Sequence, residues 1–299
     1  MYKKTIFSIT IAVVAFMFGG CAVQTHLPMT KDAQSKIQST DVVIGLSQEE
    51  IYAEIERSNT SAAVGGGLLF ALIDSAIESS RSEDAEALVT PIKNSLIDYN
   101  FPSEFETALS TELQRLTWLN NTKYQTRKPY SPNDVDSIVQ AASADVLLVF
   151  NTSYRFSPGF KSLKVSTAVT GYAKSNELQT IAKQSNPDSE KPVLYMNSFM
   201  YSQPIVGEYT NSEDAVKTWS DNNSERVRAA LTEGVTELAK MVATDLEIAR
   251  AQYKDKSLQV GEGTQVTMDG ATGTLVSEDD KRVILRLANG SMYSAPNNK

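Results

Sequence analysis

The sequence predicts an α+β fold in which helices pack on a mainly antiparallel sheet, followed by a small C-terminal SH3-like β-barrel. Several long segments carry apolar residues at helical spacing, and short apolar or alternating runs typical of strands lie between them. Short glycine-punctuated strands fill the C-terminal end. We therefore expect four parts, namely a leader over residues 1–20, a tether over 21–40, an α+β domain over 41–255 and the barrel over 256–299.

Composition excludes most familiar catalytic chemistry. The 299 residues are 41% hydrophobic and 21% charged, which is typical of a globular protein. One cysteine excludes a disulfide framework, and His26 is the single histidine on which a catalytic triad or a metal cage would have to be built. The net charge of −8 disfavours nucleic acid as a partner. We expect no catalytic residue, no cofactor and no metal site.

The N-terminus has the pattern of a secretory signal. Lys3 and Lys4 precede an apolar run that ends at Phe18, and small residues lead to Gly20, after which we expect cleavage. A membrane span is the alternative, but the run has about 14 residues where a span needs about 20. The first twenty residues are therefore predicted to be removed on export.

Phe18-Gly19-Gly20-Cys21 resembles the lipobox of bacterial lipoproteins. The resemblance implies that the sulfur of Cys21 carries two fatty acids such as palmitate and that its new amine is acylated after cleavage. Phe18 departs from the leucine usual at that position. Ala22, where aspartate would retain a lipoprotein in the inner membrane, implies the periplasmic leaflet of the outer membrane. Each buried CH₂ contributes about 0.8 kcal/mol, so two or three chains anchor a protein stably.

The residues behind Cys21 are predicted to form a flexible tether. Ala22 to Thr40 are polar, contain Pro28 and show no sustained periodicity. We expect His26 to be a solvated residue of this tether. A buried structural thiol is the alternative role for Cys21.

The body opens with two short strands and an apolar helix. Asp41–Leu46 and Glu50–Glu56 are predicted to form a hairpin. Ser61–Ile77 has helical spacing, with three glycines, Gly65–Gly67, near its start. Three interpretations of this helix stay open. It is short for a membrane insertion, it lacks the lysine of a phosphate-binding loop, and its glycines suit close packing against backbone or a self-association surface.

Three further helices are predicted before the central strands. One continues over 82–99 around Pro91, and a second begins at Ser103, which has capping-box spacing to Glu106. The third begins at Ser131-Pro132, with serine as the N-cap and proline at the first helical position.

The central strands and a long closing helix complete the domain. Asp145–Phe150 is a continuous apolar run typical of a strand buried on both faces. Lys161–Ala173 and Val193–Ile205 are predicted strands, and the first alternates as a half-exposed strand does. Lys174–Pro192 is polar and predicted to be a long loop. Ser224–Tyr253 carries an apolar stripe and is predicted to be a helix that docks on the sheet.

Three of these segments, Asp134–Phe150, Leu163–Ala173 and Leu231–Leu246, resemble the α/β domain of lipoproteins of the curli-secretion-channel or TolB-N-terminal type. The resemblance is one of topology over about half of the chain and rests on no invariant motif. It implies an outer-membrane lipoprotein with a periplasmic domain, and it assigns no functional residue.

The segment from Leu258 is predicted to be the SH3-like barrel, with a tight hairpin at Asn289-Gly290. Glu278–Asp280 is interpreted as a solvated turn, with a cation site as the alternative. Tyr293 is the only aromatic residue after Tyr253. We therefore expect this unit to be a structural cap, with ligand recognition as the alternative.

The function predicted first is that of a non-catalytic, lipid-anchored binding or structural protein on the periplasmic face of the outer membrane, acting in envelope assembly or as an adaptor. Its partners would be outer-membrane lipid, through acylated Cys21, and a second copy or an envelope protein. A subunit of an oligomeric secretion channel is the first alternative. The second is a carboxylate-dependent cell-wall hydrolase. Its candidate pairs, Asp74 with Glu78 and Glu104 with Glu106, look like a helix exit to solvent and a helix cap.

Overall fold

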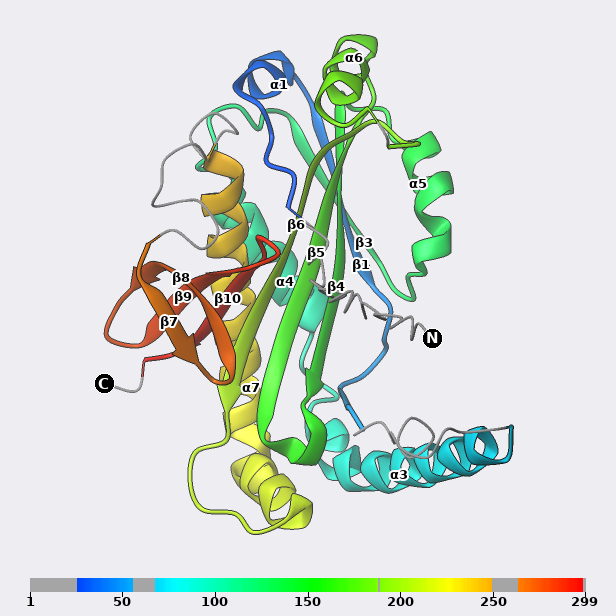
Figure 1. Ribbon diagram of the computed structural model, residues 1–299, viewed down its shortest axis with the longest axis vertical. Helices are drawn as coiled ribbons and strands as arrows, with labels where there is room; N and C mark the ends of the chain where they lie inside the picture. The colour runs from blue at the N-terminus through cyan, green and yellow to red at the C-terminus, as the bar shows by residue number, and fades with distance from the viewer. Residues whose placement is uncertain (1–25, 56–67, 188, 249–262, 298–299) are drawn as a thin grey trace, which may run out of the picture.

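The protein is built on one open, mixed sheet whose two faces are covered unequally (Figure 1). The computed structural model describes residues 26–55, 68–187, 189–248 and 263–297. The described strands are β1 (Thr40–Leu46), β2 (Tyr52–Ala53), β3 (Thr122–Arg127), β4 (Val146–Phe156), β5 (Ser162–Ala173), β6 (Val193–Pro204), β7 (Gln265–Met268), β8 (Ala271–Glu278), β9 (Arg282–Leu287) and β10 (Met292–Pro296). The described α-helices are α1 (Lys31–Lys36), α3 (Leu68–Ser95), α4 (Phe101–Leu113), α5 (Val135–Ala141), α6 (Asn176–Ser185) and α7 (Ser212–Glu247).

The strand order is β3-β1-β4-β5-β6-β10-β9-β8-β7, with β2 also pairing with β4. Strand β5 is antiparallel to both of its neighbours, β4 and β6, and the neighbouring strands along β10, β9, β8 and β7 are also antiparallel. Parallel pairing joins β1 to β3 and β4, and β10 to β6. The predicted α+β architecture with a mainly antiparallel sheet is confirmed.

The predicted SH3-like barrel is not confirmed. Strands β7 to β10 form a curled meander that continues the main sheet through the pairing of β10 with β6, and the sheet stays open. The meander buries a small core of its own around Val283, Leu285 and Tyr293. The glycine turns were local signals for short strands. The closure of a barrel depends on which strands pair, and a single sequence does not specify that.

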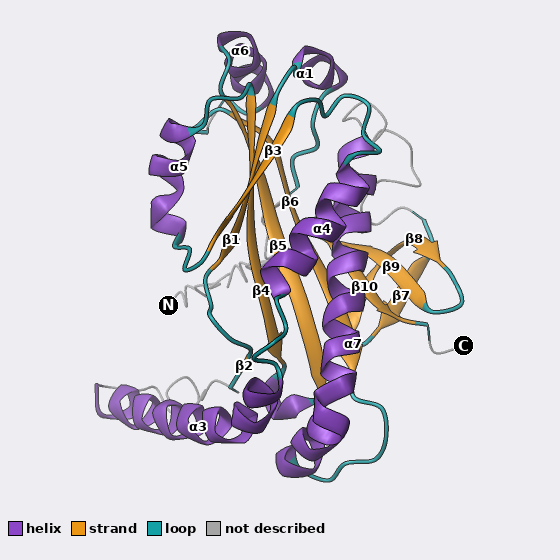
Figure 2. Ribbon diagram, turned by 180° about the vertical axis from the view of Figure 1, so that it is seen from behind, coloured by secondary structure: helices purple, strands orange, loops and turns teal. Residues whose placement is uncertain are grey.

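Helices α7 and α4 cover one face of the sheet (Figure 2). Their apolar stripes pack against the inward side chains of β4, β5 and β6 and form the main core. The Trp219 indole anchors the first part of α7 by donating to the carbonyl of Phe160 at 2.9 Å. Helix α7 begins at Ser212, before the predicted Ser224, and non-helical residues 221–224 interrupt it. The part of the predicted helix beyond residue 248 lies outside the described residues.

On the opposite face, the helix that packs on β4 among the described residues is α5, and it covers the upper half (Figure 1). Leu147 and Val149 of β4 are buried there beside Ile138 of α5. The prediction that Asp145–Phe150 is buried on both faces is therefore confirmed. Below Phe150 the strand alternates, and Asn151, the next residue along, is exposed.

The predicted hairpin at the start of the body is wrong. Strands β1 and β2 do not reverse direction, because both run parallel to β4 along one of its edges. The side chain of Gln48 fills the gap between them by pairing with the backbone of Tyr154: its amide donates to the carbonyl at 2.6 Å and its oxygen accepts from the N–H at 3.2 Å. A side-chain amide thus replaces one backbone rung of the sheet.

Two local predictions also need correction. The N-cap of α4 is Asn100, whose side chain accepts from Ser103 N, so Ser103 lies inside the first turn. The predicted loop 174–192 contains α6, capped by Ser175 and buried on one side through Leu178, Ile181 and Ala182. Strands β5 and β6 on either side of it occur as predicted.

The predicted helices over 61–77 and 82–99 form one helix where described, α3, with Pro91 inside it. Residues 61–67, including Gly65–Gly67, lie outside the described residues.

Gly234 sets how closely α7 approaches the sheet. A Cβ at this position would lie 2.8 Å from the Val165 side chain and 2.9 Å from the Tyr201 ring, which is closer than core atoms pack. Val165 and Tyr201 are fully buried, so neither has room to move away. The helix can lie at this distance because residue 234 has no side chain.

Gly234→Ala is expected to destabilise the protein by about 1–3 kcal/mol, because it overpacks this contact. The sign of this change in the free energy of unfolding is informative, because replacing glycine by alanine inside an uncrowded helix stabilises a protein by roughly 0.5–1 kcal/mol. Urea unfolding of the two proteins side by side measures the difference. An increase in the free energy of unfolding would show that α7 does not approach the sheet this closely.

Candidate functional site

The residues predicted to carry the anchor, Gly20 and Cys21, lie outside the described residues. The first described residue is His26, and it is buried at 8% exposure. The prediction of a solvated His26 in a tether running to Thr40 is therefore wrong from His26 onward. The physical reason is that this segment contributes to the core: Met29, Ala33 and Ile37 are buried in it.

Backbone and side-chain bonds fix this docked segment, residues 26–37. Leu27 and Met196 form an isolated β-bridge, with N–H to carbonyl distances of 2.7 and 2.9 Å. The Thr30 hydroxyl caps α1 by accepting from Ala33 N at 3.1 Å. The Gln34 amide then donates to the carbonyl of Leu246, near the end of α7, at 3.0 Å. The docked segment is thus joined to both β6 and α7.

A buried carboxylate, that of Asp245 on α7, lies at the centre of this junction. Its Oδ2 accepts from the Tyr195 hydroxyl at 2.7 Å and from the Asn197 amide at 2.8 Å, both on β6. Its Oδ1 accepts from the Arg286 guanidinium of β9 at 3.0 Å. His26 Nε2 lies 3.3 Å from Oδ2. We call these five residues the Asp245 cluster.

Burial makes the Asp245 cluster a strong constraint. The Asp245 side chain has no exposed surface, and that of Arg286 is 2% exposed. A charge taken out of water costs several kcal/mol unless partners surround it, so removing one partner of such a pair is far more damaging than losing a surface ion pair. The cluster therefore requires the docked segment, β6, α7 and β9 to be in place together.

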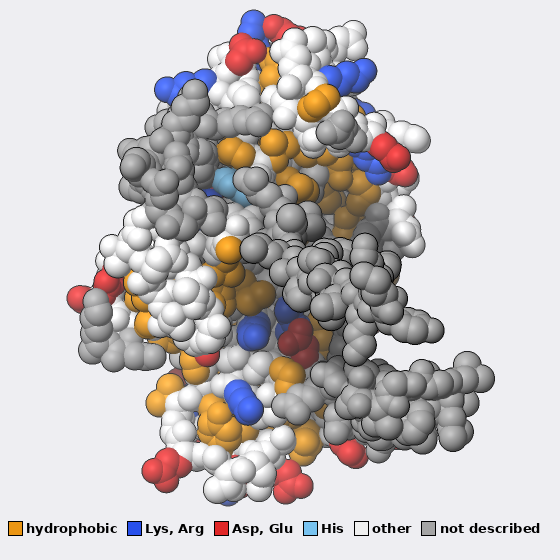
Figure 3. Space-filling view, viewed as in Figure 1, with side chains coloured by type: hydrophobic (Ala, Val, Ile, Leu, Met, Phe, Trp, Pro, Cys, Tyr) orange, Lys and Arg blue, Asp and Glu red, His pale blue; other side chains and the backbone are white. Residues whose placement is uncertain are grey.

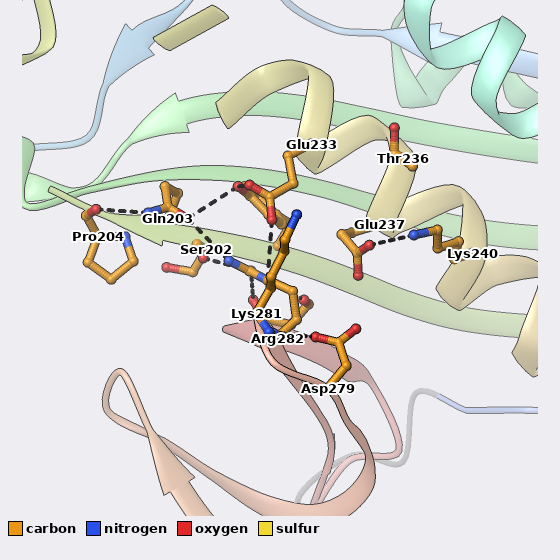
Figure 4. A network of polar contacts seen from close by, with 12 residues as sticks. Ser202, Gln203, Pro204, Glu233, Thr236, Glu237, Lys240, Asp279, Lys281 and Arg282 are labelled. Atoms are coloured by element: carbon orange, nitrogen blue, oxygen red, sulfur yellow. Dashed lines mark hydrogen bonds and ion pairs between the residues drawn. The ribbon is translucent and has the colours of Figure 1, made fainter. Parts of the chain in front are cut away.

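A second polar junction fixes the meander to the main sheet (Figure 4). The Arg282 guanidinium donates to the carbonyls of Ser202 and Ser294, each at 2.9 Å, and to Gln203 Oε1 at 3.2 Å. It also stacks over the Tyr201 ring, 4.2 Å from the centroid. Burial raises the pKa of Tyr201 well above its ordinary value, with Arg282 opposing that shift. Both arginines of β9 thus face inward and hold the meander in one position.

A groove crosses the lower half of the open sheet face and has a volume of about 540 Å³. Strand register places two rows of side chains across its floor. One row runs Ser153, Ser166, Met200 and Tyr293 over β4, β5, β6 and β10; the other runs Asn151, Ala168 and Ser198 over β4, β5 and β6. The groove exists because most of these side chains are short, whereas longer ones stand at its ends. Figure 3 shows hydrophobic and charged side chains gathered in a hollow on this face.

One ion pair lies at the β2 end of the groove. Arg155 Nε donates to the Glu54 carboxylate, and its Nη1 donates to Ser153 Oγ at 3.1 Å and Ser166 Oγ at 3.0 Å. Tyr52, 37% exposed, stands beside this pair. The guanidinium is therefore held flat against the floor with its charge balanced.

Tyr293 closes the β10 end of the groove. Its hydroxyl donates to Asp269 Oδ2 at 2.7 Å, and Asp269 also accepts from Ser202. Burial raises the pKa of Tyr293 well above its ordinary value, so this hydroxyl stays a donor at neutral pH. The β7–β8 turn is thereby held over the end of the groove.

Of the two predicted carboxylate pairs, the structure describes the side chains of Glu104 and Glu106, and these two side chains have different surroundings. Glu106 accepts from Thr126 Oγ1 at 2.9 Å, whereas Glu104 is exposed on α4, two residues away and on a different side of the helix. Asp74 and Glu78 lie on α3 in a part whose side chains are not described. Asp279 accepts from the backbone N–H groups of Lys281 and Arg282, which lower its pKa. The turn therefore occurs at residues 279–281, whereas Glu278, which the prediction placed in it, is the last residue of β8.

Two structural features are absent from the described part of the chain. Within those residues, no helix combines the length and the apolar character needed to cross a bilayer. The same residues contain no group of three or more His, Cys, Asp or Glu side chains that could hold a metal ion.

Comparisons with known proteins do not place the chain in a family. No protein-family model matches the sequence, and no curated protein matches it significantly. A crystal structure of a Xanthomonas campestris protein of the DUF330 family aligns over 74% of this chain and 90% of its own, with 9% identity and a TM-score of 0.31. A PelC dodecamer structure from Paraburkholderia phytofirmans aligns over 72% and 91%, with 10% identity and a TM-score of 0.24. Scores this low establish neither a shared fold nor a shared function.

Sequence reasoning missed both the Asp245 cluster and the groove. His26 and Asp245 are far apart in the chain and neither belongs to a motif, so nothing local indicated that they meet. The Arg282 and Arg286 positions carried a usable signal, because they alternate with Val283 and Leu285 on a predicted strand and therefore had to face the opposite side. The groove depends on cross-strand register, which local periodicity does not supply.

Asp245→Asn is expected to lower the free energy of unfolding by about 3–5 kcal/mol, because it leaves the buried Arg286 charge without its counter-charge. Chemical denaturation measures the loss. The matched control is Asp136→Asn, which removes the exposed ion pair with Lys191 and should leave stability nearly unchanged. Equal effects of the two substitutions would contradict a central role for the Asp245 cluster.

Proposed function

We propose that this chain is a lipid-anchored, non-catalytic binding protein on the periplasmic face of the bacterial outer membrane. The observation that carries the proposal is the burial of His26 so soon after the lipobox-like Cys21. Because the chain is docked from His26 onward, the tether between Cys21 and the folded body is short. The groove on the open sheet face is the binding surface that such an anchor would present.

The reach of the anchor follows from covalent geometry. Four residues lie between Cys21 and His26, so the chain makes five residue-to-residue steps of at most about 3.3–3.6 Å each, or about 18 Å in total. A tether running to Thr40 would have allowed several times that distance. An acylated Cys21 would therefore keep the body against the bilayer, with the region around His26 toward it.

The groove opens beside the point where the anchored segment joins the body. A Cβ at Gly290 would lie 2.4 Å from the Cβ of His26, so the two residues are in close contact. The next residue, Ser291, lines the groove. A ligand in the groove would thus lie next to the docked segment and, on this proposal, close to the membrane surface.

The lining of the groove supports a binding role over hydrolysis. Hydrolysis of a glycosidic bond by the common mechanism needs two carboxyl groups about 5–9.5 Å apart. Among the described residues that line the groove, Glu54 supplies the one carboxylate, and Arg155 neutralises it. Release of soluble fragments from purified peptidoglycan would instead favour the hydrolase alternative.

One observation favours the alternative of a subunit in an oligomeric channel. Helix α3 runs out from the lower end of the sheet in both views (Figures 1 and 2), and its first residues, Leu68–Ile73, are apolar in sequence. Such a helix suits contact with a second copy or with lipid after assembly. Sedimentation of detergent-extracted protein separates the two proposals: a monomer at all concentrations excludes the channel, and a closed ring supports it.

Cys21→Ser is expected to abolish lipidation and to move the protein out of the outer-membrane fraction, as an uncut or soluble precursor. Mass spectrometry of the product and fractionation of cells measure both effects. Ala22→Ser makes a matched change one residue later and should leave the outer-membrane location unchanged. Unaltered membrane attachment of Cys21→Ser, or an unmodified thiol at Cys21 in the wild type, would overturn the proposed anchor.

A further inference from the structure

We infer that the groove on the open sheet face binds a neutral oligosaccharide. This inference deepens the proposed function by naming a ligand class for the same groove. It rests on the chemistry of the lining, the charge balance and the direction of the groove across the strands.

The floor offers hydroxyl and amide groups at regular spacing. Neighbouring strands lie about 4.8 Å apart, so each row presents one side chain per strand across the sheet. The polar groups on the floor come from Asn151, Ser153, Ser166 and Ser198. A ligand that crosses the strands therefore meets polar contacts at intervals, as a chain of repeated hydroxyl-bearing units requires.

The ends of the groove add apolar contact. Tyr52 stands at the β2 end, and Met200, Leu287 and Tyr293 lie toward the β10 end. The Tyr52 ring, which is 37% exposed, gives a large contact area while its hydroxyl can bind water or ligand. A sugar ring has matching properties, since its C–H face is apolar and its edge carries hydroxyl groups. The volume of about 540 Å³ lies within the usual range of roughly 300–1,000 Å³ for small-molecule sites.

The charge balance favours a neutral ligand. Arg155 is the one cation among the described lining residues, and Glu54 already pairs with it. A phosphate or sulfate group would have to displace that carboxylate, and a cationic ligand would have to displace the guanidinium. The flat pair can instead share hydrogen bonds with hydroxyl groups, which leaves both charges compensated.

Two other ligand classes fit less well. A peptide that binds by strand addition needs the free backbone edge of a sheet, whereas the floor lies in the middle of the sheet, where β4, β5 and β6 pair with each other. A fatty acyl chain would cover the Ser198 hydroxyl without giving it a partner, and it would enclose the Arg155–Glu54 ion pair in apolar surroundings. Covering a polar group without a hydrogen bond costs about 1–3 kcal/mol for each group.

The test uses the full-length chain in mild detergent and isothermal titration calorimetry with three neutral probes: cellopentaose, maltopentaose and chitopentaose. We expect saturable binding of at least one of them. Raising the salt concentration should leave that affinity nearly unchanged, because no net charge is involved. No heat with all three probes, from protein shown by circular dichroism to be folded, would overturn the inference. A steep loss of affinity with salt would do the same.

A groove-filling variant and a matched control locate the binding. Ala168 is exposed on the floor, so Ala168→Phe should fill the groove without disturbing the core and should weaken binding by at least about tenfold. Ala229 is exposed on α7, on the other side of the sheet, and Ala229→Phe should change affinity by less than about twofold. Equal affinities for Ala168→Phe and the wild type would overturn the assignment of the groove.

The result is independent of the anchor. Calorimetry with Cys21→Ser should give the same affinity as the lipidated protein, because the proposed binding surface is made by lining residues from Ser47 onward. Sugar binding by a wild-type chain that is itself found unlipidated and outside the outer-membrane fraction would refute the proposed anchoring alone. Correct anchoring without sugar binding would refute the ligand class alone.

Discussion

The fold depends on a charge that has no contact with water. Asp245 can be ionised in the interior only because donors from several elements surround it, among them Arg286 of β9 and Tyr195 and Asn197 of β6. These donors are correctly placed only when the meander and β6 are both assembled. His26 adds the N-terminal segment to the same group. One buried carboxylate thereby joins the docked segment, β6, α7 and β9 at a single point.

The second feature that shapes the protein is the unequal covering of the two faces of the sheet by helices. Helices α7 and α4 fill one face completely, and Gly234 lets α7 approach within direct contact of β5 and β6. On the other face, the covering that the described residues provide for β4 is α5 over the upper half, and β4 changes from a doubly buried strand to an alternating one at Asn151. The lower half is left to short polar side chains between longer ones. The groove forms because β4 and its neighbouring strands extend beyond the part of this face that α5 covers.

Local sequence patterns were sufficient to predict most of the helices and strands, but they did not predict which strands pair. The apolar run before Phe150 and the alternation after Lys161 reflect burial directly, so both strands were predictable. The pairing of β1 and β2 with β4 was not, because it depends on the Gln48 amide meeting a distant backbone. Helix α6 had a readable signal in Ser175 and the spacing of the apolar residues after it. The docked segment was missed because short polar stretches resemble tethers until their tertiary partners are known.

The most direct test of the account is hydrogen exchange over residues 26–37 of the full-length protein, followed by mass spectrometry or NMR. If the segment is docked through the Leu27–Met196 bridge and the Asp245 cluster, the amide of Leu27 should exchange as slowly as those in the middle of β6. Exchange of residues 26–37 at the rate of an unstructured chain would show that the segment is a free tether. That result would contradict both the buried junction and the short anchor inferred from it.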